Sequence, residues 1–450
     1  MRAQPPPPSA SRNIDYPEIP VAQLENGLKA LCVEAHHLPR IAILAALPIG
    51  RVSNPSNNFG LAQFTLETLK EGTQSRSTRI IAEQLDQLAI DFSTEMFMEH
   101  CLVSMTLLES NLNAALELFA DILLNPSFPE DELEKVKVRW HSYLVSERSD
   151  PGFLANERLF QELFPGHPYS RLSFSLDHLG QLDREQAVHF HKNRFTCQNG
   201  LLLFAGSIHL EEDVRRAEAA LGGWSPGVPI EQNFPRLEPP RSSAISLVHR
   251  PHSVQTNVAV GLRTLPQGHP QQIHLQMMSQ VLGGGASARL FLNLREERGF
   301  TYGIYSSARG YSEDGARVIS CSVRSDKTGE TVQEIYREMQ GIQENPPDSE
   351  ELNRCKSEIV GSFIRRMETP PSIGSMELGR RLKHLPPDHY RGFIPRVNSV
   401  TQYDISEIAK RFLQPEKTAI VAVGDRAEIE EQLKPFGTIR VYATDGKQID

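Results

Sequence analysis

Two polar side chains four residues apart lie in the segment GLAQFTLETLKEGT, residues 60–73. Gln63 and Glu67 share one face of the helix that this segment predicts. Some helical zinc sites hold their metal with two side chains at this spacing. Here one position is an amide, the other is a carboxylate, and no histidine lies between them. The segment is open to three interpretations: a metal site, the remnant of one, or a structural helix.

The elements that must position this helix occur twice in the chain. The segment NPSFPEDELEKVK (125–137) and the segment NPPDSEELNRCKSE (345–358) both begin with Asn-Pro and then place acidic residues at the start of a long helical pattern. The segments at 192–208 and 409–425 each read as a helix end, a polar turn, an apolar strand and a glycine turn. Self-similarity in this order indicates an internal repeat.

The strands repeat as well. Residues 30–50 and 244–264 each predict two strands around a His- or Pro-containing turn, and a helix follows both. Hairpin-like segments come next, at 92–108 and 299–323. We therefore predict an α+β fold of two homologous domains, each a mostly antiparallel sheet with helices packed on one face. The predicted boundaries are a Pro-rich tail (1–16), a first domain (17–225), a linker (226–243), a second domain (244–437) and a C-terminal tail (438–450).

Bulk composition excludes several function classes. The 450 residues carry a formal charge of −9, which argues against binding to nucleic acid or to an anionic membrane. Five scattered cysteines without a CxxC pattern predict buried thiols and not a disulfide framework or a zinc–cysteine site. No apolar stretch reaches the roughly 20 residues that span a bilayer. Without a signal peptide in the given chain we expect a soluble cytoplasmic protein, or a periplasmic one if a leader has been removed.

An ordered set of motifs carries a family resemblance from Tyr16 to Gly437. The set comprises GLA and EGT in the first helix, the two Asn-Pro helix starts, LGGGASARLFLNLREERGFTYGIYS in the second half, and the strands ending FAGSI and AVGDR. In this order they resemble the insulinase (pitrilysin) family, which includes the mitochondrial processing peptidases. The resemblance implies a two-domain zinc peptidase fold.

Active members of that family carry an inverted motif, His-x-x-Glu-His, and a distant glutamate ligand. Aligning GLA and EGT without gaps places Gln63 and Glu67 at the two histidines and Leu66 at the general base. The distant glutamate falls on Tyr143. Zinc prefers imidazole, thiolate or carboxylate ligands, and leucine cannot move a proton. The resemblance thus implies degenerate zinc-motif positions, and we expect no metal or other cofactor in this chain.

The second half of the chain, unlike the first, keeps residues that match functional residues of the family. In LREERGFTY, Arg295 and Tyr302 match a paired arginine and tyrosine that the family brings from its second domain to the zinc site. A guanidinium and a phenol can stabilise the negative charge that develops on a carbonyl oxygen during peptide hydrolysis. From spacing alone, a surface arginine and a half-buried strand tyrosine remain the alternative.

These expectations combine into one functional hypothesis. The chain is expected to be the non-catalytic subunit of a heterodimeric zinc peptidase, inactive alone, whose homologous partner carries His-x-x-Glu-His and the zinc. This chain would donate Arg295 and Tyr302 to a peptide or unfolded-protein substrate, bound partly by strand addition to a sheet edge. The alternative is an inert structural or interaction protein, like the core subunits of respiratory complexes that share the fold.

Overall fold

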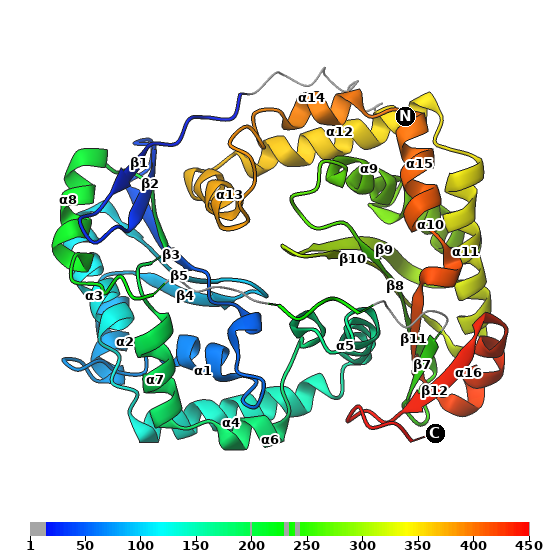
Figure 1. Cartoon of the computed structure of the whole chain (residues 1–450), viewed down its shortest axis with the longest axis horizontal. Helices are drawn as coiled ribbons and strands as arrows, with labels where there is room; N and C mark the ends of the chain where they lie inside the picture. The colour runs from blue at the N-terminus through cyan, green and yellow to red at the C-terminus, as the bar shows by residue number, and fades with distance from the viewer. Residues whose placement is uncertain (1–14, 199, 229–233, 239–243, 450) are drawn as a thin grey trace, which may run out of the picture.

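The computed structural model describes residues 15–198, 200–228, 234–238 and 244–449 and contains two six-stranded sheets, whose strands alternate with helices along the chain (Figure 1). The first sheet contains β1 (Val21–Gln23), β2 (Lys29–Glu34), β3 (Arg40–Leu47), β4 (Asp91–Met96), β5 (Cys101–Leu108) and β6 (Leu201–Gly206). The second contains β7 (Ala244–His249), β8 (Gln255–Thr264), β9 (Thr301–Gly310), β10 (Gly315–Arg324), β11 (Ala419–Gly424) and β12 (Thr438–Tyr442).

The strand orders confirm the repeat. The first sheet runs β1-β2-β6-β3-β5-β4 and the second runs β12-β7-β11-β8-β10-β9, so five strands follow the same order in both. Pairing is antiparallel except at β2–β6, β7–β11 and β7–β12. The predicted α+β class with two homologous, mostly antiparallel sheets is therefore confirmed.

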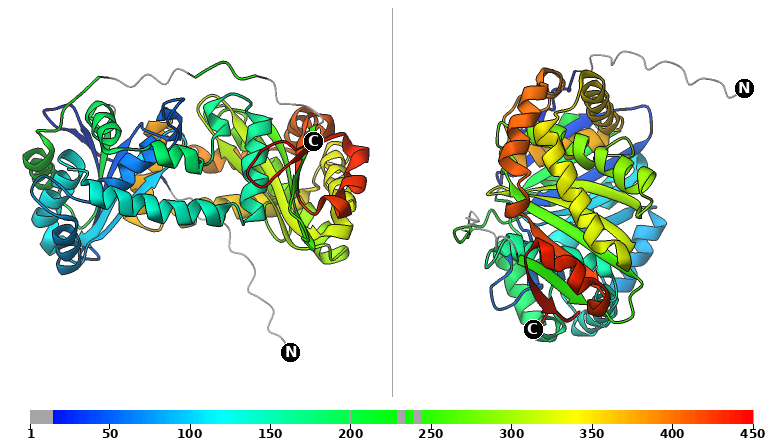
Figure 2. Two further views of the ribbon diagram at one scale, coloured as in Figure 1. Left: turned by 90° about the horizontal axis from the view of Figure 1, so that it is seen from below. Right: turned by 90° about the vertical axis from the view of Figure 1, so that its right-hand side faces the viewer.

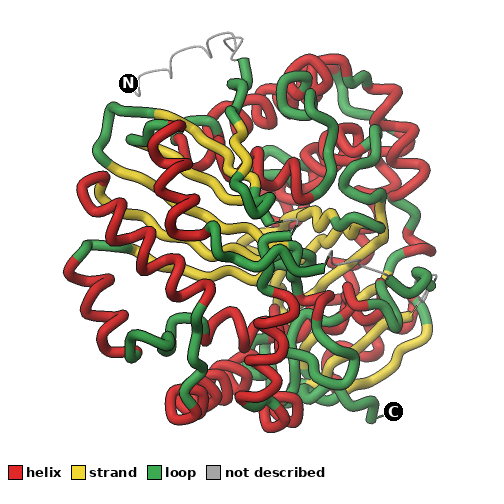
Figure 3. Tube along the Cα trace, turned by 60° about the vertical axis from the view of Figure 1, so that its left-hand side comes forward, coloured by secondary structure: helices red, strands yellow, loops and turns green. Residues whose placement is uncertain are grey.

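Helices cover both sheets (Figure 3). The first half contains α1 (Leu61–Thr68), α2 (Thr78–Gln87), α3 (Leu112–Leu124), α4 (Glu130–Glu147), α5 (Pro151–Leu163), α6 (Leu176–Gln181), α7 (Arg184–Arg194) and α8 (Leu210–Leu221). The second half contains α9 (Gln272–Gly283), α10 (Arg289–Phe291), α11 (Thr328–Glu344), α12 (Ser349–Arg366), α13 (Pro370–Leu382), α14 (Phe393–Ser399), α15 (Gln402–Phe412) and α16 (Arg426–Leu433). Of the helices that the structure describes, none is long and apolar enough to cross a bilayer.

Each sheet uses its two faces differently, because neighbouring residues of a strand point to opposite sides. In β3, Ile41 and Ile43 join the core beneath the helices of the first half, whereas Ala42 and Leu44 face a smaller apolar cluster on the other side. That second cluster includes Leu378, which belongs to α13 of the second half.

The two halves exchange one helix each. The first-half helix α5 packs on β8 and β11 of the second sheet, and the second-half helix α13 packs on β2 and β6 of the first (Figures 1 and 2). Glycine permits both close approaches. A Cβ atom at Gly261 in β8 would lie 2.8 Å from Leu159 of α5, and one at Gly374 in α13 would lie 2.5 Å from Leu203 of β6. Each sheet therefore has helices on both faces and not on one face as predicted, because the helix on the second face comes from the other half.

The ends of the two central hairpins also meet. Glu99, between β4 and β5, accepts hydrogen bonds from the Ser312 backbone N–H at 2.9 Å and from the Tyr169 hydroxyl at 2.6 Å. Ser312 lies between β9 and β10, so one carboxylate joins the two hairpins. Beside it, Tyr169, His167, Phe164 and Tyr311 pack ring against ring.

His167 makes this junction sensitive to acid. The ring is 1% exposed, its Nδ1 accepts a hydrogen bond from the Tyr169 backbone N–H, and burial, helped by the Arg263 charge, lowers its pKa to about 4. The unfolded chain takes up this proton between about pH 6.5 and pH 4, whereas the folded chain does not. The free energy of unfolding should therefore fall by about 3 kcal/mol as the pH falls through this window.

Urea unfolding at pH 7 and pH 4 tests this expectation. In His167→Gln the decrease in unfolding free energy between the two pH values should be smaller than in the wild type, because the titrating ring is gone. His141→Gln, on the exposed side of α4, is the matched control and should keep the wild-type decrease. Equal pH dependence in all three proteins would contradict the assignment.

The predicted tails and linker lie partly outside the described residues, namely 1–14, 229–233, 239–243 and 450. Tyr16, which we placed in the N-terminal tail, is 8% exposed and belongs to an apolar cluster with Phe363 and Met376. Residues 438–442, which we placed in the C-terminal tail, form β12 and pair with β7. The predicted end of the second domain at residue 437 is therefore too early, because the edge of the sheet includes this strand.

Candidate functional site

The first candidate position, Gln63, is occupied by a structural hydrogen bond. Its side chain is 7% exposed, and its Oε1 accepts a hydrogen bond from Asn54 Nδ2 at 3.0 Å. Asn54 Oδ1 in turn accepts from the backbone N–H groups of Gly60 and Ala62, which start α1. Asn54 thus caps the helix that carries Gln63, and the amide of Gln63 is part of that cap.

Leu66 and Glu67 point in different directions. Leu66 is 1% exposed and packs in the core of the first half. Glu67 lies at the solvent-accessible side of α1, and its Oε2 accepts a hydrogen bond from the Trp140 indole N–H at 2.7 Å. Desolvation by the surrounding chain raises the pKa of Glu67, while the Trp140 bond and the Arg139 charge oppose that rise. The carboxylate therefore has a partner within the fold.

Helix α4 brings Tyr143 to the same place. Its side chain is 62% exposed; burial of part of the ring and a hydrogen bond to Glu147 raise its pKa, and the Glu67 charge adds to the rise. A phenol whose pKa is raised stays protonated at neutral pH and is a poor metal ligand. The structure thus brings Glu67 and Tyr143 close together, with Gln63 one turn away on α1.

Arg51, Asn54 and Trp140 also belong to this region and were not singled out from the sequence. Arg51 Nη1 donates to the Leu172 carbonyl at 2.7 Å; burial lowers the pKa of this guanidinium, and the nearby Glu147 charge opposes that fall. No spacing pattern marks these residues, because the chain segments that carry them meet only in the folded protein.

These donors do not fit a zinc ion. The Gln63 oxygen is bonded to Asn54, Leu66 offers only carbon, and the Glu67 carboxylate is bonded to Trp140. A catalytic zinc needs three protein ligands and an open position. Within the described part of the chain, no group of three or more His, Cys, Asp and Glu side chains is placed to hold a metal ion.

Arg295 and Tyr302 lie together in one short segment of the second half. Arg295 is in the π-helical turn Leu292–Glu297, which continues α10, and Tyr302 is the second residue of β9. Gly299 makes the turn between them with a φ of +64°, a left-handed conformation that favours glycine. Arg298 holds this turn in place by its ion pair with Glu334 at 2.9 Å.

Both side chains are open to solvent. The Arg295 guanidinium lies over the Phe291 ring at 4.6 Å from its centroid, with a side chain that is 46% exposed and a Glu296 oxygen at 3.7 Å. Tyr302 is 93% exposed, and its hydroxyl makes no hydrogen bond with any residue that the structure describes. A guanidinium and a free phenol are hydrogen-bond donors for an oxygen that carries negative charge.

Family models match both halves of the chain. Residues 38–167 match the model of the insulinase family, peptidase family M16, and residues 181–359 match the peptidase M16 inactive domain. Among curated proteins, an uncharacterized zinc protease of Rickettsia bellii is 24% identical over 408 residues, 89% of this chain and 96% of that protein. One of Mycobacterium leprae is 25% identical over 409 residues, 88% of this chain and 90% of that protein.

Solved structures share the fold. A peptidase M16 inactive domain from Pseudomonas fluorescens has a TM-score of 0.84 at 23% identity, covering 91% of this chain and 98% of that one. A protease from Helicobacter pylori has a TM-score of 0.82 at 16% identity, covering 90% and 99%. With both halves matched in order by models of one family, the chain belongs to the insulinase family of peptidases, M16.

Proposed function

We propose that this chain is the non-catalytic subunit of a two-subunit zinc peptidase. The observation that supports this proposal is a difference between the zinc-motif positions and Tyr302. The side chains at the zinc-motif positions are bonded within the fold, through Asn54 and Trp140, whereas the Tyr302 hydroxyl has no partner in the described residues. A donor that is fully exposed and unpartnered is suited to a group from outside the chain.

The partner subunit and this chain would supply different groups to the active site. A homologous partner with an intact His-x-x-Glu-His motif would supply the zinc and the general base. Arg295 and Tyr302 would donate hydrogen bonds to the carbonyl oxygen of the scissile peptide bond, which becomes negative as water attacks. The substrate would be an extended peptide or an unfolded protein. The second matched model, described as an inactive domain, covers residues 181–359 and therefore includes Arg295 and Tyr302.

Zinc analysis of the separate and combined subunits tests the proposal. After dialysis we expect much less than one equivalent of zinc in the purified chain and no peptide cleavage, because the donors at Gln63 and Glu67 are engaged. The complex with a His-x-x-Glu-His partner should hold zinc and cleave an unfolded protein. Stoichiometric zinc and peptidase activity in the chain alone would overturn the proposal. A stable complex in which this chain adds no activity would make it an interaction protein of the same fold.

A further inference from the structure

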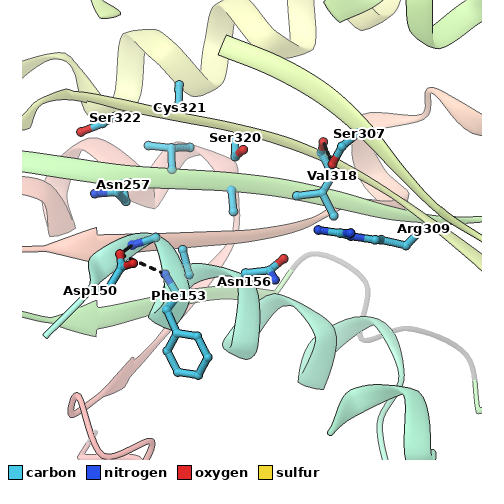
Figure 4. Close-up of a pocket in the computed structure, with 14 residues that line it drawn as sticks. Asp150, Phe153, Asn156, Asn257, Ser307, Arg309, Val318, Ser320, Cys321 and Ser322 are labelled. Atoms are coloured by element: carbon cyan, nitrogen blue, oxygen red, sulfur yellow. Dashed lines mark hydrogen bonds between the residues drawn. The ribbon is translucent and has the colours of Figure 1, made fainter. Parts of the chain in front are cut away.

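A polar pocket lies between the start of α5 and the second sheet, away from the turn that carries Arg295 (Figure 4). Its volume is about 450 Å³. The residues that carry its polar lining are Asp150, Asn156, Asn257, Ser307, Arg309, Ser320 and Ser322. The pocket exists because α5 covers only part of the sheet, so polar residues of β9 and β10 replace apolar ones beyond the helix.

One end of the pocket is negative. Asp150 caps α5, and its Oδ1 accepts hydrogen bonds from the backbone N–H groups of Gly152 at 2.7 Å and Phe153 at 3.3 Å. Its second oxygen, Oδ2, makes no hydrogen bond within the residues that the structure describes. A Cβ atom at Gly152 would lie 4.0 Å from Asn257 Oδ1, so this end of the pocket lies against Asn257 of β8.

The other end is positive. Arg309 of β9 makes no ion pair with any described residue, and Figure 4 shows its guanidinium turned back over Val318 toward Asn156. On β10, Ala316 lies opposite Arg309 and Ser322 lies opposite Asn257. These two positions of β10 are six residues apart, so the two ends of the pocket are about 20 Å apart at backbone level. The Arg309 side chain extends from its strand into the pocket, so its guanidinium faces the groups that line the pocket.

Neutral hydrogen-bonding groups lie between the two charges. Ser307, Ser320 and Asn156 provide hydroxyl and amide groups that can both donate and accept. A peptide backbone offers one donor and one acceptor per residue, and its free ends carry an ammonium and a carboxylate. Three to four extended residues span about 10–14 Å, which is shorter than the roughly 20 Å between the two ends at backbone level, so such a peptide can lie within the pocket.

We propose that this pocket binds a short extended peptide of three to four residues with free termini. The peptide carboxylate pairs with Arg309 and the peptide ammonium with Asp150. Arg309 is seven residues beyond Tyr302 on the same strand, about 23 Å away at backbone level, so the two sites are separate. The inference does not rest on the proposed function, because every residue of the pocket belongs to this chain.

Isothermal titration of the full chain, without a partner, with tetraalanine tests the proposal. We expect saturable binding that weakens about ten- to a hundredfold when the peptide is N-acetylated or C-amidated, since each change removes one charge-assisted pair. Arg309→Gln should weaken tetraalanine binding to a similar extent and leave the amidated peptide unaffected. Asp150→Asn should weaken tetraalanine binding but not the acetylated peptide.

The variants are chosen to keep the fold intact. Asparagine is as good a helix cap as aspartate, so Asp150→Asn should preserve the start of α5. Arg324→Gln is the matched control: Arg324 is also on the second sheet, is 68% exposed and pairs with Asp326 at 3.0 Å outside the pocket. Absence of tetraalanine binding, equal binding of the capped peptides, or equal effects of Arg309→Gln and Arg324→Gln would each overturn the proposal.

Discussion

Replacing Arg295 with alanine is expected to lower kcat of the reconstituted two-subunit peptidase about ten- to a thousandfold, the range for removing one donor to a developing oxyanion. The guanidinium is half exposed and lies over Phe291, so its loss leaves no buried cavity and should not affect folding. Tyr302→Phe should act similarly through loss of one hydroxyl donor. Because these contacts strengthen in the transition state, KM should change less than kcat.

The measurement is steady-state cleavage of a quenched peptide, with zinc content and complex formation measured in parallel. Arg337→Ala is the control for loss of an exposed arginine in the same half, since Arg337 is 71% exposed on α11. It should leave kcat unchanged. Arg295→Lys should recover only part of the activity, because an ammonium lacks the planar fork of the guanidinium. Wild-type kcat in both Arg295→Ala and Tyr302→Phe would assign these residues a structural role.

Replacing Leu159 with alanine is expected to lower the free energy of unfolding by about 2–5 kcal/mol, the range for removing a fully buried leucine side chain. Leu159 is fully buried and packs against Gly261 of the second sheet, although its helix follows the first. The change should therefore weaken the contact between the two halves as well as one core.

Both tryptophans of the chain, Trp140 and Trp224, lie in the first half, so their fluorescence reports on that half. In Leu159→Ala the fluorescence midpoint in urea should fall together with amide protection of β8 and β10 in the second half. Leu176→Ala, a leucine that is 43% exposed on α6, should stay within about 0.5 kcal/mol of the wild type. An unchanged fluorescence midpoint with lost protection in β8 and β10 would show that the halves unfold independently.

Local patterns predicted most of the fold. Alternation at 92–108 became β4 and β5, and the two Asn-Pro segments became the starts of α4 and α12. Such features depend on residues close in sequence, so one sequence suffices to see them. The free, buried cysteines were predicted on the same basis, and all five are buried.

The helix exchange could not be predicted in this way. The apolar residues of α5 indicate a helix with one buried face, and they do not indicate which sheet that face meets. The same limit applies to the candidate site. The bond from Trp140 to Glu67 spans 73 positions, and the exposure of Tyr302 depends on what the rest of the chain leaves uncovered. Long-range contacts of this kind require the folded structure.

The exchange of α5 and α13 makes each half of the chain depend on the other to cover one face of its sheet. Each half supplies one helix to the other at an equivalent place after its long helix, α4 or α12. A single half synthesised as a separate chain would expose the sheet face that the other half covers, and a second copy could cover it by the same contact. The two halves are thus arranged like the two subunits of a helix-swapped dimer, although both belong to one polypeptide. Covalent connection then keeps the two units at a high effective concentration, so the swapped arrangement forms within one molecule and does not require two.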